Sequence, residues 1–518
     1  GQTCAAWELC LVDDGSRDPA VRAELRAAVA HDERVRLVER PVAGGIVVAS
    51  NQALGLATGE FVALLDHDDR LHPEALTLVD AALRAAPDVD YLYTDEDKIA
   101  DDGTVYDTFL KPEWSPERLR AQNYCTHLSV LRRSLVEDVG RFRHGFDGSQ
   151  DHDLILRVTE RARRIQHVPA VLYHWCVTPG SAAADPDAKP YAREAGRRAV
   201  ADHVDRVGID AEVEHLATPG HYRVRRHLPD PAPSVSIVVP TVGTSRPVWG
   251  VTRPLVLGAV RSVRAVTTYP GDVEVVVVAD PATPTADLDE LAELGVTVVA
   301  GAGPFNFSAR CNEGVAAGHG DIVVLLNDDV VVEQPDWLDV VVGFFGERDV
   351  GVVGTRLVYA DGTLQHGGIL LNEQPLHIFH GFAGSDPGPF GLLQIDREVS
   401  AVTGACLATP RWLYEELGGL PTEFAIAFND LDYCLRVRAG GRRVVWTPHA
   451  TLYHFESQTR RPDAERHEIE LLYGRWSCEL RHDPYGNPGF APRQAVWLPA
   501  ERAGVRAALR HRWRRRRQ

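Results

Sequence analysis

The chain has 518 residues, of which 44% are hydrophobic and 25% charged, and its formal net charge is −18. This length and composition are typical of a globular protein with more than one domain, and they exclude collagen-like and intrinsically disordered chains. The negative charge disfavours general nucleic-acid binding, the eight cysteines include no CxxC pair, and no apolar run is long enough to predict a membrane span, so we expect a cytoplasmic protein.

The first part of the chain alternates between short apolar strands and helices. We expect strands at 7–14, 34–40 and 61–65, separated by helices at 19–32 and 45–59. Such alternation is typical of βαβ units, so it predicts an α/β fold with a mostly parallel sheet.

The second part repeats this order and adds a strand, VSIVVPT, at its beginning. The expected elements are strands at 235–241, 273–280 and 321–329 and helices at 255–266 and 305–320. Only six residues precede the strand at 7–14, so the first part has no room for a counterpart of the added strand. Because the sequence also contains no methionine, we expect the chain to lack its true start.

These patterns predict two domains, at 1–226 and 235–480, joined by the proline-rich linker 227–234 and followed by an extension at 481–518. The extension ends in a basic tail, since eight arginines and one acid follow from Glu501 onward. Such a tail is either a solvated chain end or a patch that contacts anionic lipid headgroups.

Three polar motifs occur in the same order in both parts. In the first part they are FVALLDHDD, SQDHDLILRV and VLYHW, and in the second IVVLLNDD, FNDLDYCLRV and TLYHF. Their polar residues are Asp66, Asp68, Asp69, Asp151, Asp153, Arg157 and His174, and then Asn327, Asp328, Asp329, Asp430, Asp432, Arg436 and His454. Three ordered motifs are hard to repeat by accident, so they predict two copies of one site-bearing domain.

The acidic motif of each part follows a predicted strand. Ligands of open α/β sheets bind outside the carboxyl ends of the strands, where this motif lies. The pairs Asp66/Asp68 and Asn327/Asp329 supply oxygen ligands that suit Mg²⁺ or Mn²⁺ together with a diphosphate. The alternative is a solvated turn at the end of a strand.

Asp151 and Asp430 each begin a D-x-D-x-x-L-R-V segment. Asp153 with Arg157, and Asp432 with Arg436, have the i, i+4 spacing of a helical ion pair. The leading aspartates then remain available as general bases, or they serve as helix N-caps.

Other histidines support fewer conclusions. His174 and His454 follow a Leu-Tyr pair and are either structural or placed near a diphosphate. His366, His377 and His380 have no metal-site spacing, and we consider them as a wall on the acceptor side.

The motifs also carry a resemblance. LVDDGS, NQALGLATGEFVALLDHDD, YTDEDK, KPEW and GFDGSQDHDLILRV resemble family 2 glycosyltransferases of bacterial surface-polysaccharide assembly, as do VSIVVPT, FNFSARCNEGV, LLNDDV, GACLATP and AFNDLDYCLRVRAGG. The resemblance implies a Rossmann-like GT-A fold in each part, with the first lacking its N-terminal strand.

The family's site residues match positions of this sequence. Asp151 and Asp430 match the catalytic base, and Asp68 and Asp329 match the metal-binding aspartate. The remaining matches concern the nucleotide sugar: Asp13, Asp14, Asp66, Thr241, Asp280, Asn327 and Asp328. From their place in the repeats we also expect His174 and His454 to bind the nucleotide sugar, beside the diphosphate. Asn327 departs from the family by replacing the leading aspartate of its motif.

The resemblance implies an inverting hexosyltransferase that uses a nucleotide-sugar donor, Mg²⁺ or Mn²⁺, and a glycan or lipid-linked acceptor. The predicted setting is the cytoplasm, with the basic tail at the inner face of the plasma membrane. Two alternatives stay open: one active domain beside a degenerate partner that docks acceptor, and a scaffold that binds nucleotide sugar or glycan without catalysis.

Overall fold

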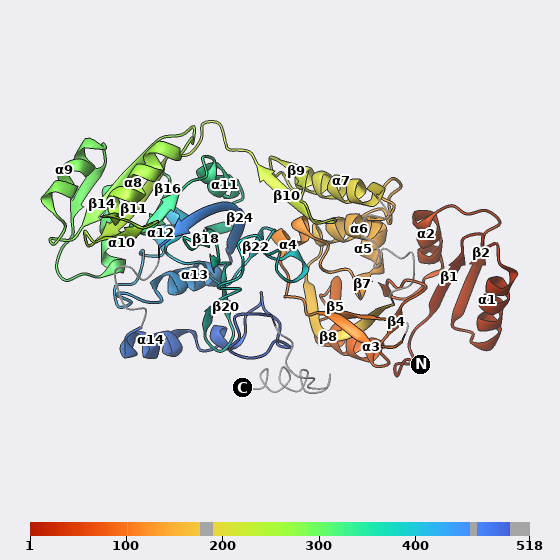
Figure 1. Cartoon of the computed structure of the whole chain (residues 1–518). Coiled ribbons are helices and arrows are strands. Elements are labelled where there is room, and N and C mark those ends of the chain that lie inside the picture. Colours follow the sequence, from red (N-terminus) through yellow and green to blue (C-terminus); the bar gives the residue numbers. More distant parts are fainter. Residues whose placement is uncertain (101, 177–189, 456–463, 498–518) are drawn as a thin grey trace.

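A computed structural model describes residues 1–100, 102–176, 190–455 and 464–497. The chain forms two halves that lie side by side, with the N-terminal elements at one end of the molecule (Figure 1). The predicted basic tail lies outside the described residues. Within them, no helix combines the length and apolar character that a bilayer crossing requires.

The first half contains a separate pair of strands and a larger sheet. β1 (Leu9–Asp13) and β2 (Val35–Glu39) pair in parallel beside α1 (Pro19–His31) and α2 (Ile46–Leu56). The six-stranded sheet has the order β3 (Phe61–Ala63), β7 (Ser129–Arg132), β5 (Tyr91–Ile99), β8 (Ile165–Cys176) and β4 (Arg70–Leu71), with β6 (Val105–Phe109) on β5. Further elements are α3 (Ala75–Ala85), α4 (Pro116–Ala121), α5 (Arg133–Asp138), α6 (Gln150–Thr159), α7 (Pro190–Arg206), β9 (Ala211–His215) and β10 (Tyr222–Arg226).

The second half is built on one ten-stranded sheet. Its main order is β15 (Thr297–Ala300), β14 (Val273–Ala279), β11 (Val235–Thr241), β16 (Ile322–Leu326), β23 (Cys406–Pro410), β18 (Val350–Val358), β24 (Arg443–His454) and β17 (Val330–Val332), with β19 (Leu364–His366) on β18 and β22 (Arg397–Glu398) on β24. Its helices are α8 (Leu255–Val266), α9 (Thr285–Glu293), α10 (Phe307–Ala317), α11 (Trp337–Gly343), α12 (Arg411–Glu416), α13 (Asn429–Ala439) and α14 (Arg466–Trp476). Two hairpins, β12 (Ser245–Val248) with β13 (Val251–Pro254) and β20 (Ile369–Leu371) with β21 (Pro375–His377), pair outside this sheet.

The two halves share one strand topology. The series β16-β23-β18-β24-β17 has the same order and pairing directions as β3-β7-β5-β8-β4. In the second half β11 joins this series to the parallel pair β14-β15. No strand among the described residues has that position in the first half, in keeping with the predicted absence of this strand, and β1-β2 is a separate sheet.

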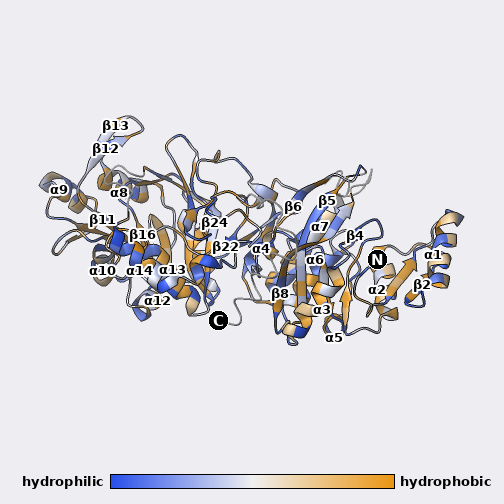
Figure 2. Cartoon of the chain, turned by 90° about the horizontal axis from the view of Figure 1, so that it is seen from below, coloured by the Kyte–Doolittle hydropathy of each residue, from blue (hydrophilic) through white to orange (hydrophobic). Residues whose placement is uncertain are grey.

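The sheet of the second half is parallel from β15 to β16 and mixed beyond β16. Its central strands are buried on both faces, which explains their continuous apolar sequences. Successive side chains of a strand point to opposite faces: Val238 belongs to the apolar cluster that contains residues of α10 and α13, and Val239 to the cluster that contains residues of α8. Figure 2 shows apolar residues along many of the strands in both halves.

The halves meet at a buried group of charges. Glu117 on α4 accepts ion pairs from Arg226 (2.7 Å), Arg120 (3.0 Å) and, from the other half, Arg443 (3.2 Å). The same arginines also contact Glu347 of the second half. Burial by itself raises the pKa of Glu117, but these arginines outweigh it and lower the pKa, so the carboxylate stays charged.

Candidate active site

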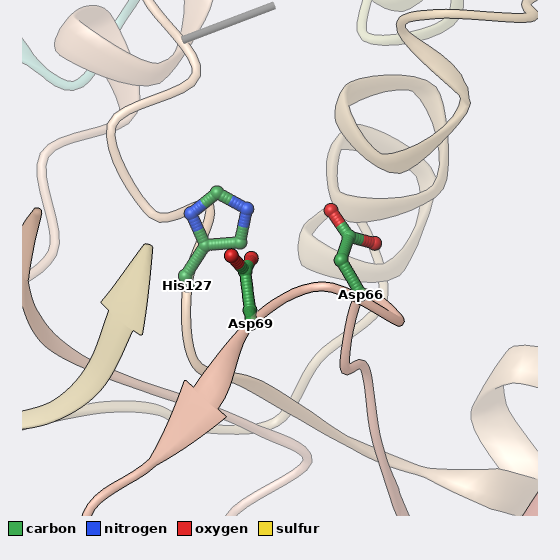
Figure 3. Close-up of side chains that lie close together, drawn as sticks. All are labelled: Asp66, Asp69 and His127. Carbon is green, nitrogen blue, oxygen red and sulfur yellow. The ribbon is translucent and has the colours of Figure 1, made fainter. Parts of the chain in front are cut away.

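The acidic motif of the first half forms a loop between β3 and β4. Asp66 and Asp69 point toward His127, which precedes β7 (Figure 3), and the nearest ligand atoms of the three side chains lie within 4.8 Å of one another. Carboxylate oxygens and an imidazole nitrogen are suitable ligands for Mn²⁺, so this group fits a divalent cation. The sequence analysis missed His127, because its place in the site depends on the pairing of β7 with β3 and β5.

The electrostatics of this loop favour a bound cation. Burial raises the pKa of Asp66, and the charges of Asp151 and Asp68 raise it further, while His127 opposes them. Burial lowers the pKa of His127, but Glu96 outweighs burial and raises it. A divalent cation would relieve the repulsion among these carboxylates.

Asp68 and Asp69 have different surroundings. Both oxygens of Asp69 accept hydrogen bonds, one from the Tyr173 hydroxyl (2.5 Å) and one from the backbone N–H of Cys176 (2.8 Å). One oxygen of Asp68 lies 3.7 Å from the ring nitrogen Nδ1 of its neighbour His67. The spacing of the sequence equates Asp68 with Asp329.

The strand register instead equates Asp69 with Asp329. Arg70 pairs with His174, and Val330 pairs with His454, so the residues preceding β4 and β17 are Asp69 and Asp329. The assignment of Asp68 as a metal ligand therefore stays a prediction, with Asp69 as its competitor.

The two expected bases lie in the first turn of matching helices. Asp151 of α6 accepts a hydrogen bond from the Asn123 side chain (2.9 Å), and burial raises its pKa. Asp430 of α13 accepts hydrogen bonds from the backbone N–H groups of Gly404 (2.7 Å) and Leu431 (2.8 Å). Neither is the N-cap, a position taken by Ser149 and Phe428, so the N-cap alternative is wrong.

The predicted ion pairs behind these bases are confirmed. Arg157 donates to Asp153 (2.6 Å) and Arg436 donates to Asp432 (2.8 Å). Each arginine also donates to two backbone carbonyls of the preceding loop, those of Val139 and Arg141 in the first half and those of Leu417 and Gly419 in the second. The same anchor therefore orients both helices, and it leaves the leading aspartate free of an arginine partner on its own helix.

A backbone link joins the acidic motif of the second half to its base. Asn327 donates its backbone N–H to Ala405 (3.0 Å), the residue after Gly404, which donates to Asp430. The buried side-chain oxygen of Asn327 has no hydrogen-bond partner among the described residues. A buried oxygen without a hydrogen-bond donor is suited to bind a cation. The Asp329 carboxylate and the His454 ring nitrogen, which lie 3.1 Å apart, are further suitable ligands.

The two matching histidines have different partners. His454 contacts Asp329 and Asn327 of its acidic motif, whereas Nδ1 of His174 lies 2.6 Å from Asp97 of β5. That both histidines lie beside a diphosphate stays a prediction.

The nucleoside-binding residues expected in the second half lie together at the carboxyl ends of three strands. The Thr241 hydroxyl donates to Asp328 (2.6 Å), and the backbone carbonyl of Thr241 accepts from the N–H of Asp280 (2.9 Å). The buried Arg310 of α10 contacts Asp280 at 3.4 Å. Sequence reasoning missed Arg310, although FNFSARCNEGV contains it.

Asp13 and Asp14 lie at the end of β1, on the separate sheet. Asp13 accepts from Ser16 and Arg22, both at 3.0 Å. Asp14 accepts from the backbone N–H groups of Gly44 and Gly45 at the start of α2 (2.8 Å each). Their described contacts hold the β1-β2 unit together, and their binding of a nucleoside stays a prediction.

The histidine cluster is divided in two. His366 lies 3.0 Å from His377, and it accepts from the N–H of Thr403 (3.4 Å), next to the Gly404 that holds Asp430. Burial lowers the pKa of His366. His380 instead contacts Tyr359 (2.8 Å).

These features define an α/β protein with two tandem domains, each pairing an acidic motif at a strand end with a carboxylate on a following helix. Residues 231–478 match the family "Glycosyltransferase like family 2", and residues 1–140 match "Glycosyl transferase family 2". The chain belongs to glycosyltransferase family 2, and its two halves are tandem GT-A domains, as predicted.

Several known proteins are similar to this chain. It is 42% identical over 509 residues to the uncharacterized protein y4gI of Sinorhizobium fredii, which covers 95% of this chain and 55% of that protein. It is 35% identical over 502 residues to the O-antigen biosynthesis protein RfbC of Myxococcus xanthus, covering 94% of this chain and 38% of that protein. The chain thus spans about half or less of the length of these relatives.

Among solved structures, the chain is similar to the mannosyltransferase PcManGT of Pyrobaculum calidifontis in complex with GDP-Man and Mn²⁺. The identity is 19% and the TM-score 0.33, over 49% of this chain and 71% of that one.

Proposed function

We propose that the chain transfers a hexose from a nucleotide-diphosphate donor to a glycan or lipid-linked acceptor, with inversion at the anomeric carbon. The observation that carries this proposal is the repeated carboxylate, Asp151 or Asp430, held in the first turn of a helix near an acidic motif. A binding scaffold has no need of a general base at that place, which is why we favour catalysis.

The reaction follows from the position of the base. The acceptor hydroxyl oxygen bonds to the anomeric carbon while its proton passes to the carboxylate of Asp151 or Asp430. The bond between the anomeric carbon and the diphosphate oxygen breaks, and the electron pair leaves with the nucleoside diphosphate. Burial, which raises the pKa of Asp151, makes this carboxylate a stronger proton acceptor.

The acidic motifs are the proposed cation sites. Mg²⁺ or Mn²⁺ held there would neutralise the diphosphate. In the second half we propose Asp329, with Asn327 and His454 beside it, on the basis of their contacts. In the first half Asp66 is common to both ligand sets, and the second carboxylate is Asp68 by sequence spacing or Asp69 by strand register.

The remaining predicted residues are proposed to bind the donor. In the second half Thr241, Asp280 and Asp328 bind the nucleoside end, which their mutual contacts support. In the first half we propose Asp13 and Asp14, with His174 near the diphosphate. The proposed domains are 1–226 and 235–480, with the linker 227–234 between β10 and β11.

The names of relatives support polysaccharide synthesis as the process. One relative is an O-antigen biosynthesis protein, and another, 26% identical over 174 residues, is a chondroitin synthase of Pasteurella multocida. We propose a cytoplasmic reaction, with the basic tail at the inner face of the plasma membrane.

A second candidate function is one active domain beside an acceptor-docking partner. The observation that favours it is the continuity of the second-half sheet, which joins the nucleoside residues to the acidic motif through β11. In the first half the corresponding strands belong to separate sheets.

Substituting the bases one at a time tests the proposal. We expect Asp430→Asn to abolish second-site transfer and Asp151→Asn to abolish first-site transfer, each by about 10²- to 10⁴-fold, with donor affinity nearly unchanged. Transfer and donor binding are measured with UDP-, GDP- and dTDP-sugars in Mn²⁺ and then in EDTA. Transfer that persists in the double variant contradicts the mechanism, and loss in only one single variant supports one active domain.

A further inference from the structure

The C-terminal segment 482–497 lies between the two halves and is anchored in the second. The buried Asp483 accepts hydrogen bonds from the backbone N–H of Leu371 and from the Ser400 hydroxyl, both at 2.6 Å. Asn372 donates its side-chain amide to the carbonyl of Ala491 (2.8 Å). The segment therefore has a fixed place on the second half.

The same segment also bonds to the interior of the first half. The carbonyl of Pro484 accepts from the N–H of Glu113 (2.7 Å). Asn487 donates its side-chain amide to the carbonyl of Lys111 (2.7 Å) and to the two carboxylate oxygens of Asp95 (3.1 and 3.2 Å). Asn487 is 7% exposed and Asp95 is 1% exposed, so their hydrogen bonds are shielded from bulk solvent.

Asn487 thereby fixes the backbone of Lys111. Asp95 accepts from the N–H of Lys111 (2.8 Å) as well as from Asn487, so both backbone groups of Lys111 are held. The Lys111 side chain is fully buried and donates to Glu96 (3.0 Å) and to the carbonyl of His127. A buried ammonium group is stabilised only when its partners lie in good hydrogen-bonding geometry, and the position of the Lys111 backbone sets that geometry.

Glu96 carries the network to the cation group. It accepts from the backbone N–H of His127 and contacts Nδ1 of the same residue, both at 3.1 Å. Burial raises the pKa of Glu96, but Lys111 and His127 outweigh it and lower the pKa to about 2. A histidine that donates one ring N–H to a carboxylate presents its other nitrogen in a fixed direction. In this chain, fixing the His127 ring therefore also fixes the geometry of the group that His127 forms with Asp66 and Asp69.

We infer that the segment 482–497 completes the first catalytic site, with Asn487 as a positioning residue that orients His127 at the cation site through Lys111 and Glu96. This inference rests on the proposed cation site of the first half. It assigns to an element anchored on the second half a role in the chemistry of the first.

Mn²⁺ titration of the full chain tests the inference. The background is Asp329→Asn, which removes the proposed cation aspartate of the second half, and free Mn²⁺ is followed by its electron paramagnetic resonance signal. We expect Asn487→Ala to raise the Mn²⁺ half-saturation concentration about tenfold, the lower end of the effect of residues that orient a metal ligand. First-site transfer is measured over the same Mn²⁺ range, and we expect it to need correspondingly more Mn²⁺ to reach half of its maximum.

Asn372→Ala is the matched control. It removes a side-chain amide that also bonds the segment, but from the second half only, and we expect it to leave the Mn²⁺ half-saturation unchanged. If Asn487→Ala fails to fold, Asn487→Ser, which keeps a donor on a small side chain, is titrated in its place, and a shift in the same direction is expected.

The outcomes separate the two proposals. An unchanged half-saturation in the Asn487 variant, or an equal shift in Asn372→Ala, overturns the inference and leaves the cation site standing. A background chain that binds no Mn²⁺ overturns the first-half cation site and the inference with it.

Discussion

The two halves place matching helices, which carry the proposed bases, in different surroundings. Arg157 and Arg436 anchor α6 and α13 through the same pattern of one aspartate and two carbonyls. The acidic motifs differ: His454 contacts the motif of the second half, whereas His174 contacts Asp97 and His127 faces the motif of the first. The proposed base is thus held alike in both halves, while the proposed cation site is built from different residues.

The two halves also differ at the residues that are predicted to bind the donor. In the second half, the hydrogen bond from Thr241 to Asp328 joins the nucleoside residues directly to the acidic motif. In the first half, the described contacts of Asp13 and Asp14 stay within the β1-β2 unit. A duplicated motif therefore identifies shared chemistry without implying equal donor binding.

The largest expected effect is on first-site transfer, when the second carboxylate of the proposed cation site of the first half is removed. In an Asp430→Asn chain, we expect Asp68→Asn to lower first-site transfer about 10³-fold at fixed Mn²⁺, because a cation supplies several kcal/mol of charge stabilisation. Asp69→Asn tests the other ligand, and it should also lower the thermal unfolding midpoint, since both oxygens of Asp69 accept hydrogen bonds. If Asp69→Asn instead has the larger effect on Mn²⁺ half-saturation, the strand register identifies the ligand.

Exchanging the leading residues of the two acidic motifs should have an intermediate effect, on Mn²⁺ affinity. Asp66 and Asn327 are the leading residues of the two motifs, and they differ by one charge. We expect Asp66→Asn to raise the Mn²⁺ half-saturation of the first site about tenfold and Asn327→Asp to lower that of the second by a similar factor, because affinity follows ligand charge. Each variant is titrated in a chain whose other half has lost its proposed cation-binding aspartate. Half-saturation shifts of the same sign in both variants contradict a shared role of Asp66 and Asn327 in cation binding.

The smallest expected effect is a displacement of the pH profile. Burial raises the pKa of Asp151, and a base acts only when ionised, so first-site transfer should rise with pH through that raised pKa. Asn123→Ala removes a hydrogen bond that favours the ionised form, so the acid limb should move to still higher pH, with little change at pH values well above it. Transfer is measured against pH in an Asp430→Asn chain, and a limb that stays or moves to lower pH argues against Asp151 as the base.

Features that depend on local spacing could be predicted from the sequence. The strand–helix alternation, the acidic motifs at strand ends and the Asp153–Arg157 pair all follow from periodicity within a few residues. His127 could not be found in this way, because its contacts with Glu96 and Lys111 depend on strand pairing. Asn487 was still harder to find, because it lies 392 residues from Asp95 in the sequence.

The buried charges around Glu117 have a consequence for engineering. A half transplanted into another member of the family would bring Glu117, Arg120 and Arg226 without Glu347 and Arg443, or the reverse. Each half would keep its internal pairs, Glu117 with Arg120 and Arg226 or Glu347 with Arg443, but it would lose the pairs that cross the boundary and leave the buried charges less well balanced. Exchange of sugar specificity between chains of this kind is therefore better attempted within a half than by swapping whole halves as cassettes.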